Sequence, residues 1–234
     1  MRNEFFQRSE LLLGSDAMKK LNSAKVIIFG IGGVGGYAAE ALVRSGVGNI
    51  VFVDNDCVSE SNINRQIIAT SVNVGQPKVE AMIQRARMIN PDVNVGGLNI
   101  FYDAKTQFDI NLGHFDYIVD AIDSVRSKLL LIENAKKANV DIISCMGAGN
   151  KTDPSAFQVS DISRTSVCPL AKIMRHELRA RGIENLKVVF STEPPRFADE
   201  LSERSRNVIG SIAPSVGVAG LLMANTVVMD LIRK

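Results

Sequence analysis

The sequence of 234 residues contains no tryptophan, two histidines and only three cysteines, Cys57, Cys145 and Cys168. Three is an odd number, and no two of these cysteines form a C-x-x-C pair. We therefore expect neither a disulfide framework nor a zinc site. Such sparse cysteine use is typical of a reducing compartment.

The chain also lacks an excess of charge of one sign. Its 27 Lys and Arg nearly balance its 25 Asp and Glu, which leaves a formal charge of +2. Bulk charge thus does not indicate a nucleic-acid-binding protein, and any site for a polyanion must be local. The N-terminal MRNEFFQRSE carries charges where a signal peptide needs an apolar run, so we expect a cytoplasmic protein.

One uncharged stretch, residues 207–229, is long enough to cross a bilayer as a helix. Pro214, Asn225 and Thr226 interrupt its apolar character. We therefore predict a loop followed by a buried helix from about Val216 to Ile232, which packs in the core or at a subunit interface. A membrane anchor is the less favoured alternative.

Short apolar runs that read as strands alternate with amphipathic helical segments. This alternation predicts an α/β fold, a doubly wound Rossmann-like sheet that is mostly parallel and has helices on both faces. The predicted strands are Lys25–Phe29, Asn49–Asp54, Val93–Ile100, Tyr117–Asp123 and Asp141–Gly147, and the predicted helices between them are Tyr37–Gly46, Lys78–Ile89 and Ser127–Ala138.

We expect residues 1–234 to form one domain, with residues 25–150 as its nucleotide-binding core. Further strands at Phe157–Ser163 and Lys187–Ser191, with a helix at Pro169–Arg181 between them, read as an extension of the same sheet. Residues 151–234 would then form a substrate-side extension and a C-terminal segment for crossover or dimer contacts.

The first predicted strand runs into a glycine-rich turn. Gly30, Gly32 and Gly35 satisfy G-x-G-x-x-G, with Gly33 inside the motif, and Asp54 follows 19 residues after Gly35. Such a turn brings backbone N–H groups and a helix N-terminus to phosphate, and the acidic residue can accept hydrogen bonds from a ribose. The pattern predicts a nucleotide-binding site.

Two cations and two acids near this turn suggest which nucleotide binds. Arg65 and Lys78 exceed what a dinucleotide pyrophosphate needs, and they suit a triphosphate whose departing pyrophosphate must be neutralised. Asp56 and Asp123 could hold Mg²⁺ against the phosphates. Taken singly, each residue could instead be an ordinary surface charge or a helix cap.

Five segments in this order, GIGGVGG, VDND, SNINRQ, GQPKVE and DAIDS, resemble the adenylating domain shared by ubiquitin-activating enzymes and bacterial activators of sulfur-carrier proteins. The resemblance extends from about Phe6 to the C-terminus. It implies ATP and Mg²⁺ as cofactors, with Asp54 on the ribose, Asp123 and Asp56 on the metal, and phosphate contacts from Asn62, Arg65, Gln66 and Lys78. It further implies a homodimer in which Arg8 reaches the partner subunit's ATP.

Three later segments, SCMGAGNKTDP, DISRTSVCPLAK and KVVFSTEPP, resemble the branch of this family that acts on tRNA. That branch uses ATP to adenylate the carboxylate of threonylcarbamoyladenosine and to drive its dehydrative cyclisation, with release of AMP and pyrophosphate. The alternative substrate is the C-terminal glycine of a ubiquitin-like sulfur-carrier protein. A sulfur-transfer protein stays open as a further partner.

Two features beyond the nucleotide motif are candidates for function. Cys168 precedes Pro169 at a predicted helix start, where a thiolate would be stabilised, although a packing role is the commoner explanation. Lys172, Arg175 and Arg179 recur at helical spacing and could contact tRNA phosphates, or they could form an ordinary solvated face.

Two other classes of protein share part of the pattern. An NAD-binding oxidoreductase would explain the glycine turn and Asp54, but it gives Arg65 and Lys78 no role. A binding module that uses ATP only to order a partner surface would need no turnover. A nicotinamide titration without response, alongside ATP binding, would exclude the oxidoreductase, and formation of AMP by the purified protein would exclude the binding module.

Overall fold

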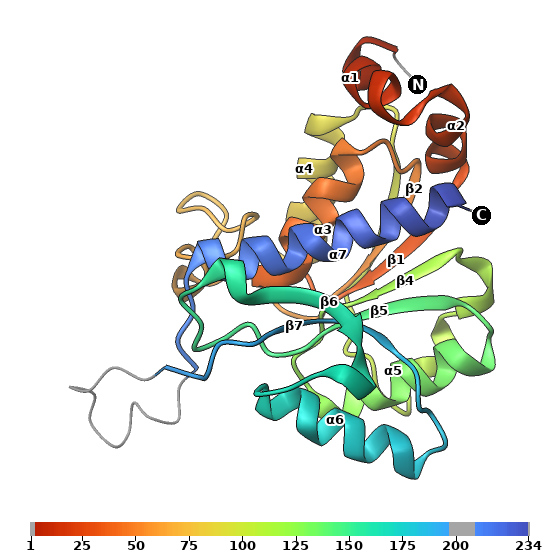
Figure 1. Ribbon diagram of the computed structural model, residues 1–234. Helices are drawn as coiled ribbons and strands as arrows, with labels where there is room; N and C mark the ends of the chain where they lie inside the picture. Colours follow the sequence, from red (N-terminus) through yellow and green to blue (C-terminus); the bar gives the residue numbers. More distant parts are fainter. Residues whose placement is uncertain (1–2, 197–208, 234) are drawn as a thin grey trace.

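A computed structural model describes residues 3–196 and 209–233. Its sheet has the strand order β3-β2-β1-β4-β5-β7-β6, and the strands pair in parallel except β6, which is antiparallel to β7 (Figure 1). The predicted doubly wound sheet is confirmed. The strands are β1 Lys25–Phe29, β2 Asn49–Val53, β3 Asn94–Leu98, β4 Tyr117–Asp120, β5 Asp141–Cys145, β6 Phe157–Asp161 and β7 Lys187–Ser191.

Helices cover both faces of the sheet. One apolar cluster joins the sheet to α3, α4 and α7, and a second joins its other face to α5 and α6 (Figure 1). The α-helices are α1 Asn3–Leu13, α2 Ser15–Ser23, α3 Gly33–Arg44, α4 Lys78–Ile89, α5 Val125–Lys137, α6 Pro169–Ala180 and α7 Ala213–Arg233. Strands β7 and β6 thus extend the same sheet, as predicted, and α6 packs on one of its faces.

Several element bounds differ from those predicted, among them those of β4, α3 and β3. Strand β4 ends at Asp120 rather than Asp123, because the Asp120 Oδ1 atom accepts a hydrogen bond from the Ile122 N–H and turns the chain. Helix α3 begins at Gly33 instead of Tyr37, so the glycine turn runs straight into the helix. Strand β3 is shorter at both ends than predicted.

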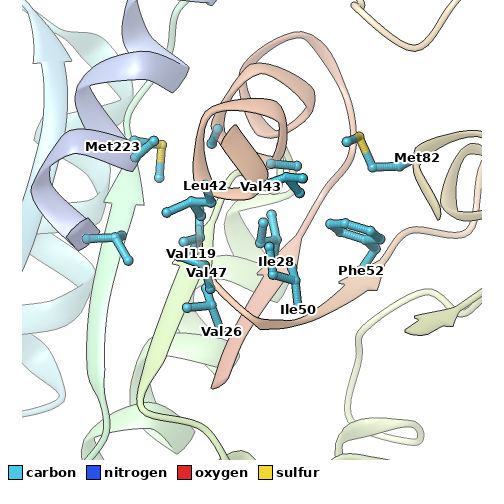
Figure 2. Close-up of a cluster of buried hydrophobic side chains, with 14 of the residues drawn as sticks. Val26, Ile28, Leu42, Val43, Val47, Ile50, Phe52, Met82, Val119 and Met223 are labelled. Atoms are coloured by element: carbon cyan, nitrogen blue, oxygen red, sulfur yellow. The ribbon is translucent and has the colours of Figure 1, made fainter. Parts of the chain in front are cut away.

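The core between β1, β2 and the helices is closely packed with branched and sulfur-containing side chains. Figure 2 shows Leu42 and Val43 of α3 facing Ile28 of β1, with Met82 of α4 and Met223 of α7 on either side. All five are fully buried. Burial of this kind is the main favourable term in holding helices on a sheet.

Helix α7 is long and apolar enough to cross a membrane, yet 56% of its most apolar window is buried within the protein. It lies along α3 in Figure 1. A Cβ at Gly220 would stand 2.4 Å from the Val34 carbonyl oxygen, so this glycine allows the two backbones to approach closely. Helix α7 is therefore a core helix, as expected from the sequence.

Candidate functional site

A cavity of about 460 Å³ opens at the carboxyl ends of the parallel strands. It lies where the strand order reverses between β1 and β4, which is the usual ligand position in open α/β sheets. Apart from Gly35, all of the residues predicted to bind the nucleotide within one chain line it: Gly30, Gly32, Gly33, Asp54, Asp56, Asn62, Arg65, Gln66, Lys78 and Asp123.

The glycines of the turn have different roles. Gly30 has a φ of +85°, and a Cβ there would lie 2.6 Å from the Ala121 carbonyl oxygen, whereas a Cβ at Gly35 would lie 1.8 Å from the Gly30 oxygen. At Gly32, which precedes α3, the nearest atom would be Gln66 Nε2 at 3.8 Å. The N-terminus of α3 therefore opens into the cavity with space for an anion.

Asp54 connects the glycine turn to the segment after β2. Its Oδ2 accepts a hydrogen bond from the Ile31 N–H at 2.6 Å, and its Oδ1 accepts one from the Asp56 N–H at 2.9 Å. Lys78 places its Nζ 2.7 Å from Asp56 Oδ2 and 4.0 Å from Asp54 Oδ1. The nearly buried lysine charge is thus compensated by two acids at the cavity wall.

The connection from β2 to α4 supplies further polar groups. Arg65 Nη1 donates to the Ser61 carbonyl at 2.8 Å and to Asn64 Oδ1 at 3.0 Å. Asn62 is buried, and its Oδ1 caps the short 3₁₀ helix Glu60–Asn62 by accepting from the Ser59 N–H. The segment therefore contributes the Arg65 guanidinium and the side-chain amides of Asn62 and Gln66 to the cavity wall.

The two acids predicted for the metal differ in availability. Asp56 Oδ2 is taken by Lys78, whereas the exposed Asp123 carboxylate has no partner within residues 3–196 and 209–233. That same part of the chain has no cluster of three or more His, Cys, Asp or Glu side chains. Mg²⁺ usually takes only one or two protein carboxylates together with substrate phosphates, so Asp123 fits this ion.

Neither Cys168 nor Arg8 lines the cavity of its own chain. Cys168 is buried at 4% exposure at the start of α6 and does not line the cavity, although Leu170 does. Arg8 is exposed on α1 and is likewise not a lining residue. The burial of Cys168 is consistent with packing, and among the described residues no contact holds the exposed Arg8 in the cavity of its own chain.

The predicted basic face of α6 needs a correction at one position. Lys172 and Arg179 are exposed, but Arg175 is half-buried, and its Nη1 donates to the Thr165 carbonyl at 2.9 Å and to Thr165 Oγ1 at 2.7 Å. Helical spacing placed Arg175 on the same side but could not reveal this partner. Arg175 therefore helps to fix the loop before α6 through its Nη1.

Sequence reasoning missed two groups at the site. Ile209 and Ser211, from the segment that leads into α7, line the cavity. Lys128 of α5 is fully buried, directly follows the lining residue Ser127, and pairs with Asp120. Lys128 occupies the helix face that also carries Leu131, Ile132 and Ala135, and a lysine on an apolar face is the signal that could have revealed it.

The glycine turn at the switch point, the acidic residue after β2 and the cations beside the α3 N-terminus together define a nucleotide-binding protein of the Rossmann type. The model of the ThiF family matches residues 6–234. The chain belongs to this family.

Relatives in this family are similar over nearly the whole chain. A tRNA threonylcarbamoyladenosine dehydratase of Bacillus subtilis is 42% identical, over 97% of this chain and 94% of its own length. The solved Escherichia coli tRNA N6-threonylcarbamoyladenosine dehydratase in complex with AMP is 31% identical, with a TM-score of 0.91 and coverage of 99% of this chain and 95% of that one. Its complex with ATP aligns over the same shares of the two chains with a TM-score of 0.88.

Proposed function

We propose that this protein is an ATP-dependent tRNA threonylcarbamoyladenosine dehydratase, which activates the carboxylate of the modified adenosine and drives its cyclisation. The observation that carries the proposal is the meeting of Lys78, Arg65 and the α3 N-terminus in one cavity. Three positive groups there suit a triphosphate better than a dinucleotide. Relatives that cover almost the full chain carry this name, and one was solved with ATP.

The chemistry follows from the leaving group. A carboxylate is a poor electrophile, because an attacking group would have to expel oxide from it. If the carboxylate oxygen attacks the α-phosphorus of ATP, pyrophosphate leaves, and AMP later leaves when a neighbouring atom of the threonylcarbamoyl group closes the ring. Ring closure needs no second substrate and benefits from effective molarities of about 10⁵ M or more.

The protein's part is to hold charge and position. Asp54 would accept the ribose hydroxyls, and the open N–H groups at Gly32 and Gly33 would receive phosphate oxygens. Lys78 and Arg65 would neutralise the departing pyrophosphate, with Asn62 and Gln66 as further phosphate contacts. Asp123 would hold Mg²⁺, which would supply additional charge neutralisation on the phosphates.

Contacts to the tRNA backbone and to the partner subunit would come from outside the cavity. Residues 151–234 would form the substrate side of a single domain, and the exposed Lys172 and Arg179 of α6 would contact tRNA phosphates. Charge reversal at Lys172 should weaken tRNA binding and flatten its salt dependence, and an unchanged salt slope would remove α6 from this surface. We propose a homodimer in which Arg8 serves the partner's site.

The test combines two measurements on the purified protein. Incubation with ATP, Mg²⁺ and tRNA that carries threonylcarbamoyladenosine should release AMP and lower the mass of the modified nucleoside by one water. Lys78→Met should abolish both, while Lys105→Met, a lysine outside the ATP cavity, should leave both unchanged. AMP formation that depends on a sulfur-carrier protein, with the nucleoside unaltered, would overturn the proposal.

A further inference from the structure

The segment Ile209–Ser211 is tied to both sides of the nucleotide cavity. On the β5 side, the Gly210 N–H donates to Asn150 Oδ1 at 2.7 Å, and the Asn150 N–H donates to the Gly210 carbonyl at 2.7 Å. On the β2 side, Asn64 Nδ2 donates to the Ser211 carbonyl at 2.9 Å. Three hydrogen bonds therefore fix the backbone of this segment between β5 and the β2–α4 connection.

The residues around Asn150 are suited to this attachment. Asn150 has a φ of 57°, a left-handed conformation that asparagine tolerates better than most side chains. A Cβ at Gly149 would stand 2.1 Å from Ile209 Cγ2, so only glycine leaves room for Ile209 against the β5 loop. The position of Ser211 is therefore determined by neighbours on both sides.

The Ser211 hydroxyl is the notable group on this segment. Its Oγ is buried and, among the residues that the structure describes, has no hydrogen-bond partner. Gln66 is 6% exposed, and its Oε1 is unpartnered in the same sense. Both residues line the nucleotide cavity. Because buried polar groups in folded proteins are nearly always paired, the unpaired Ser211 hydroxyl indicates a missing ligand that accepts its proton, whereas the Gln66 oxygen, itself an acceptor, would need a donor.

The surroundings indicate the charge of that ligand. Gln66 Nε2 lies beside Gly32 at the start of α3, and Val216 at the beginning of α7 packs against Gly33. Ser211 lines the same cavity as Gly32 and Gly33, at which α3 begins. A hydroxyl, an amide and a helix N-terminus that face one space are the donors that an oxyanion requires.

We infer that Ser211 is a further ligand-binding residue of this site, which donates its hydroxyl proton to an oxyanion held at the N-terminus of α3. This inference rests on the proposed function, which offers two oxyanions: a phosphate oxygen of ATP and the carboxylate of the threonylcarbamoyl group. Asn64 and Asn150 are positioning residues, because they act only by fixing the backbone that carries Ser211.

The experiment measures ATP affinity by calorimetry without tRNA, and then the KM for modified tRNA at saturating ATP. Ser211→Ala should weaken one of the two by about 10-fold or more, because a hydrogen bond to a charged group is lost. Weaker ATP binding assigns the hydroxyl to phosphate, and a higher KM for tRNA with unchanged ATP affinity assigns it to the carboxylate. Unchanged values for both would overturn the inference.

Three further variants guard the interpretation. Ser211→Thr keeps the hydroxyl and should restore most of the lost affinity, while Ser71→Ala, an exposed serine outside the cavity, should change neither value. If Ser211→Ala does not fold, Asn150→Gly takes its place, since glycine keeps the left-handed backbone and loses only the bond to the Gly210 N–H. Wild-type protein that binds ATP but leaves modified tRNA unchanged would contradict the proposed function. The comparison of ATP affinities between wild type and Ser211→Ala would still test the role of the hydroxyl.

Discussion

Lys128 of α5 and Asp120 at the end of β4 form an ion pair in which both side chains are completely buried, with Nζ and Oδ2 3.0 Å apart. The Ser144 hydroxyl of β5 donates to the same Oδ2 at 2.6 Å. Through its Oδ1, Asp120 also shapes the turn that carries Asp123 into the cavity. A buried charge network thus connects the packing of α5 to the position of the proposed metal-binding carboxylate.

Removal of one member of this pair should be costly. Lys128→Met should lower the free energy of unfolding by about 3–5 kcal/mol, because Asp120 keeps a buried charge without its partner. Urea unfolding gives the value, and Lys19→Met, which breaks the exposed pair with Asp16, should leave the free energy of unfolding nearly unchanged. Equal losses in the two variants would show that Asp120 is compensated by other groups.

Substitutions at two glycines of the turn should have different effects, one on folding and the other on ATP binding. Gly35→Ala should prevent folding, because its Cβ would meet the Gly30 oxygen at 1.8 Å. Gly32→Ala should fold normally, because its Cβ meets no protein atom closer than 3.8 Å, but it should bind ATP at least about 10-fold more weakly, because the methyl group occupies phosphate space. Circular dichroism and calorimetry test the two halves, and normal ATP affinity of Gly32→Ala would place the phosphates elsewhere.

Much of the fold and of the nucleotide site could be predicted because the signals are local. A β-branched run, a glycine turn and an apolar helix are contiguous, so Gly30, Gly33 and Asp54 needed no knowledge of tertiary contacts. Lys78 is distant in sequence, but it opens a helix directly after a parallel strand and its connection, and such connections end at the same edge of the sheet. The topology then brings it to the cavity.

The remainder depends on contacts that no local pattern encodes. Arg175 matched a basic helix face, and only the position of Thr165 shows that its guanidinium is occupied. The contribution of Ser211 requires the chain to return from the sheet edge to α3, with Asn64 and Asn150 as its two attachments. Both cases arise from loop geometry, which sequence periodicity does not describe.

The cysteines should differ sharply in reactivity. Burial raises the pKa of the Cys145 thiol to about 12, whereas Cys57 is exposed. Because the thiolate is the reactive form, iodoacetamide at pH 8 should modify the exposed Cys57 and leave the buried Cys145 unmodified in the native protein. Peptide mass spectrometry measures both. After unfolding in urea, Cys145 should react as well, and labelling of native Cys145 at pH 8 would show that the cavity wall opens.

The proposed sharing of sites between subunits predicts complementation. Arg8→Ala should inactivate the partner's site, and Asp123→Ala should inactivate its own. In a mixed dimer, one site therefore carries both defects and the other carries neither. If subunits of the two inactive variants exchange randomly, half of the dimers are mixed, and AMP formation should recover to about a quarter of the wild-type rate. Native mass spectrometry establishes exchange, and no recovery among exchanged dimers would place Arg8 outside the partner's site.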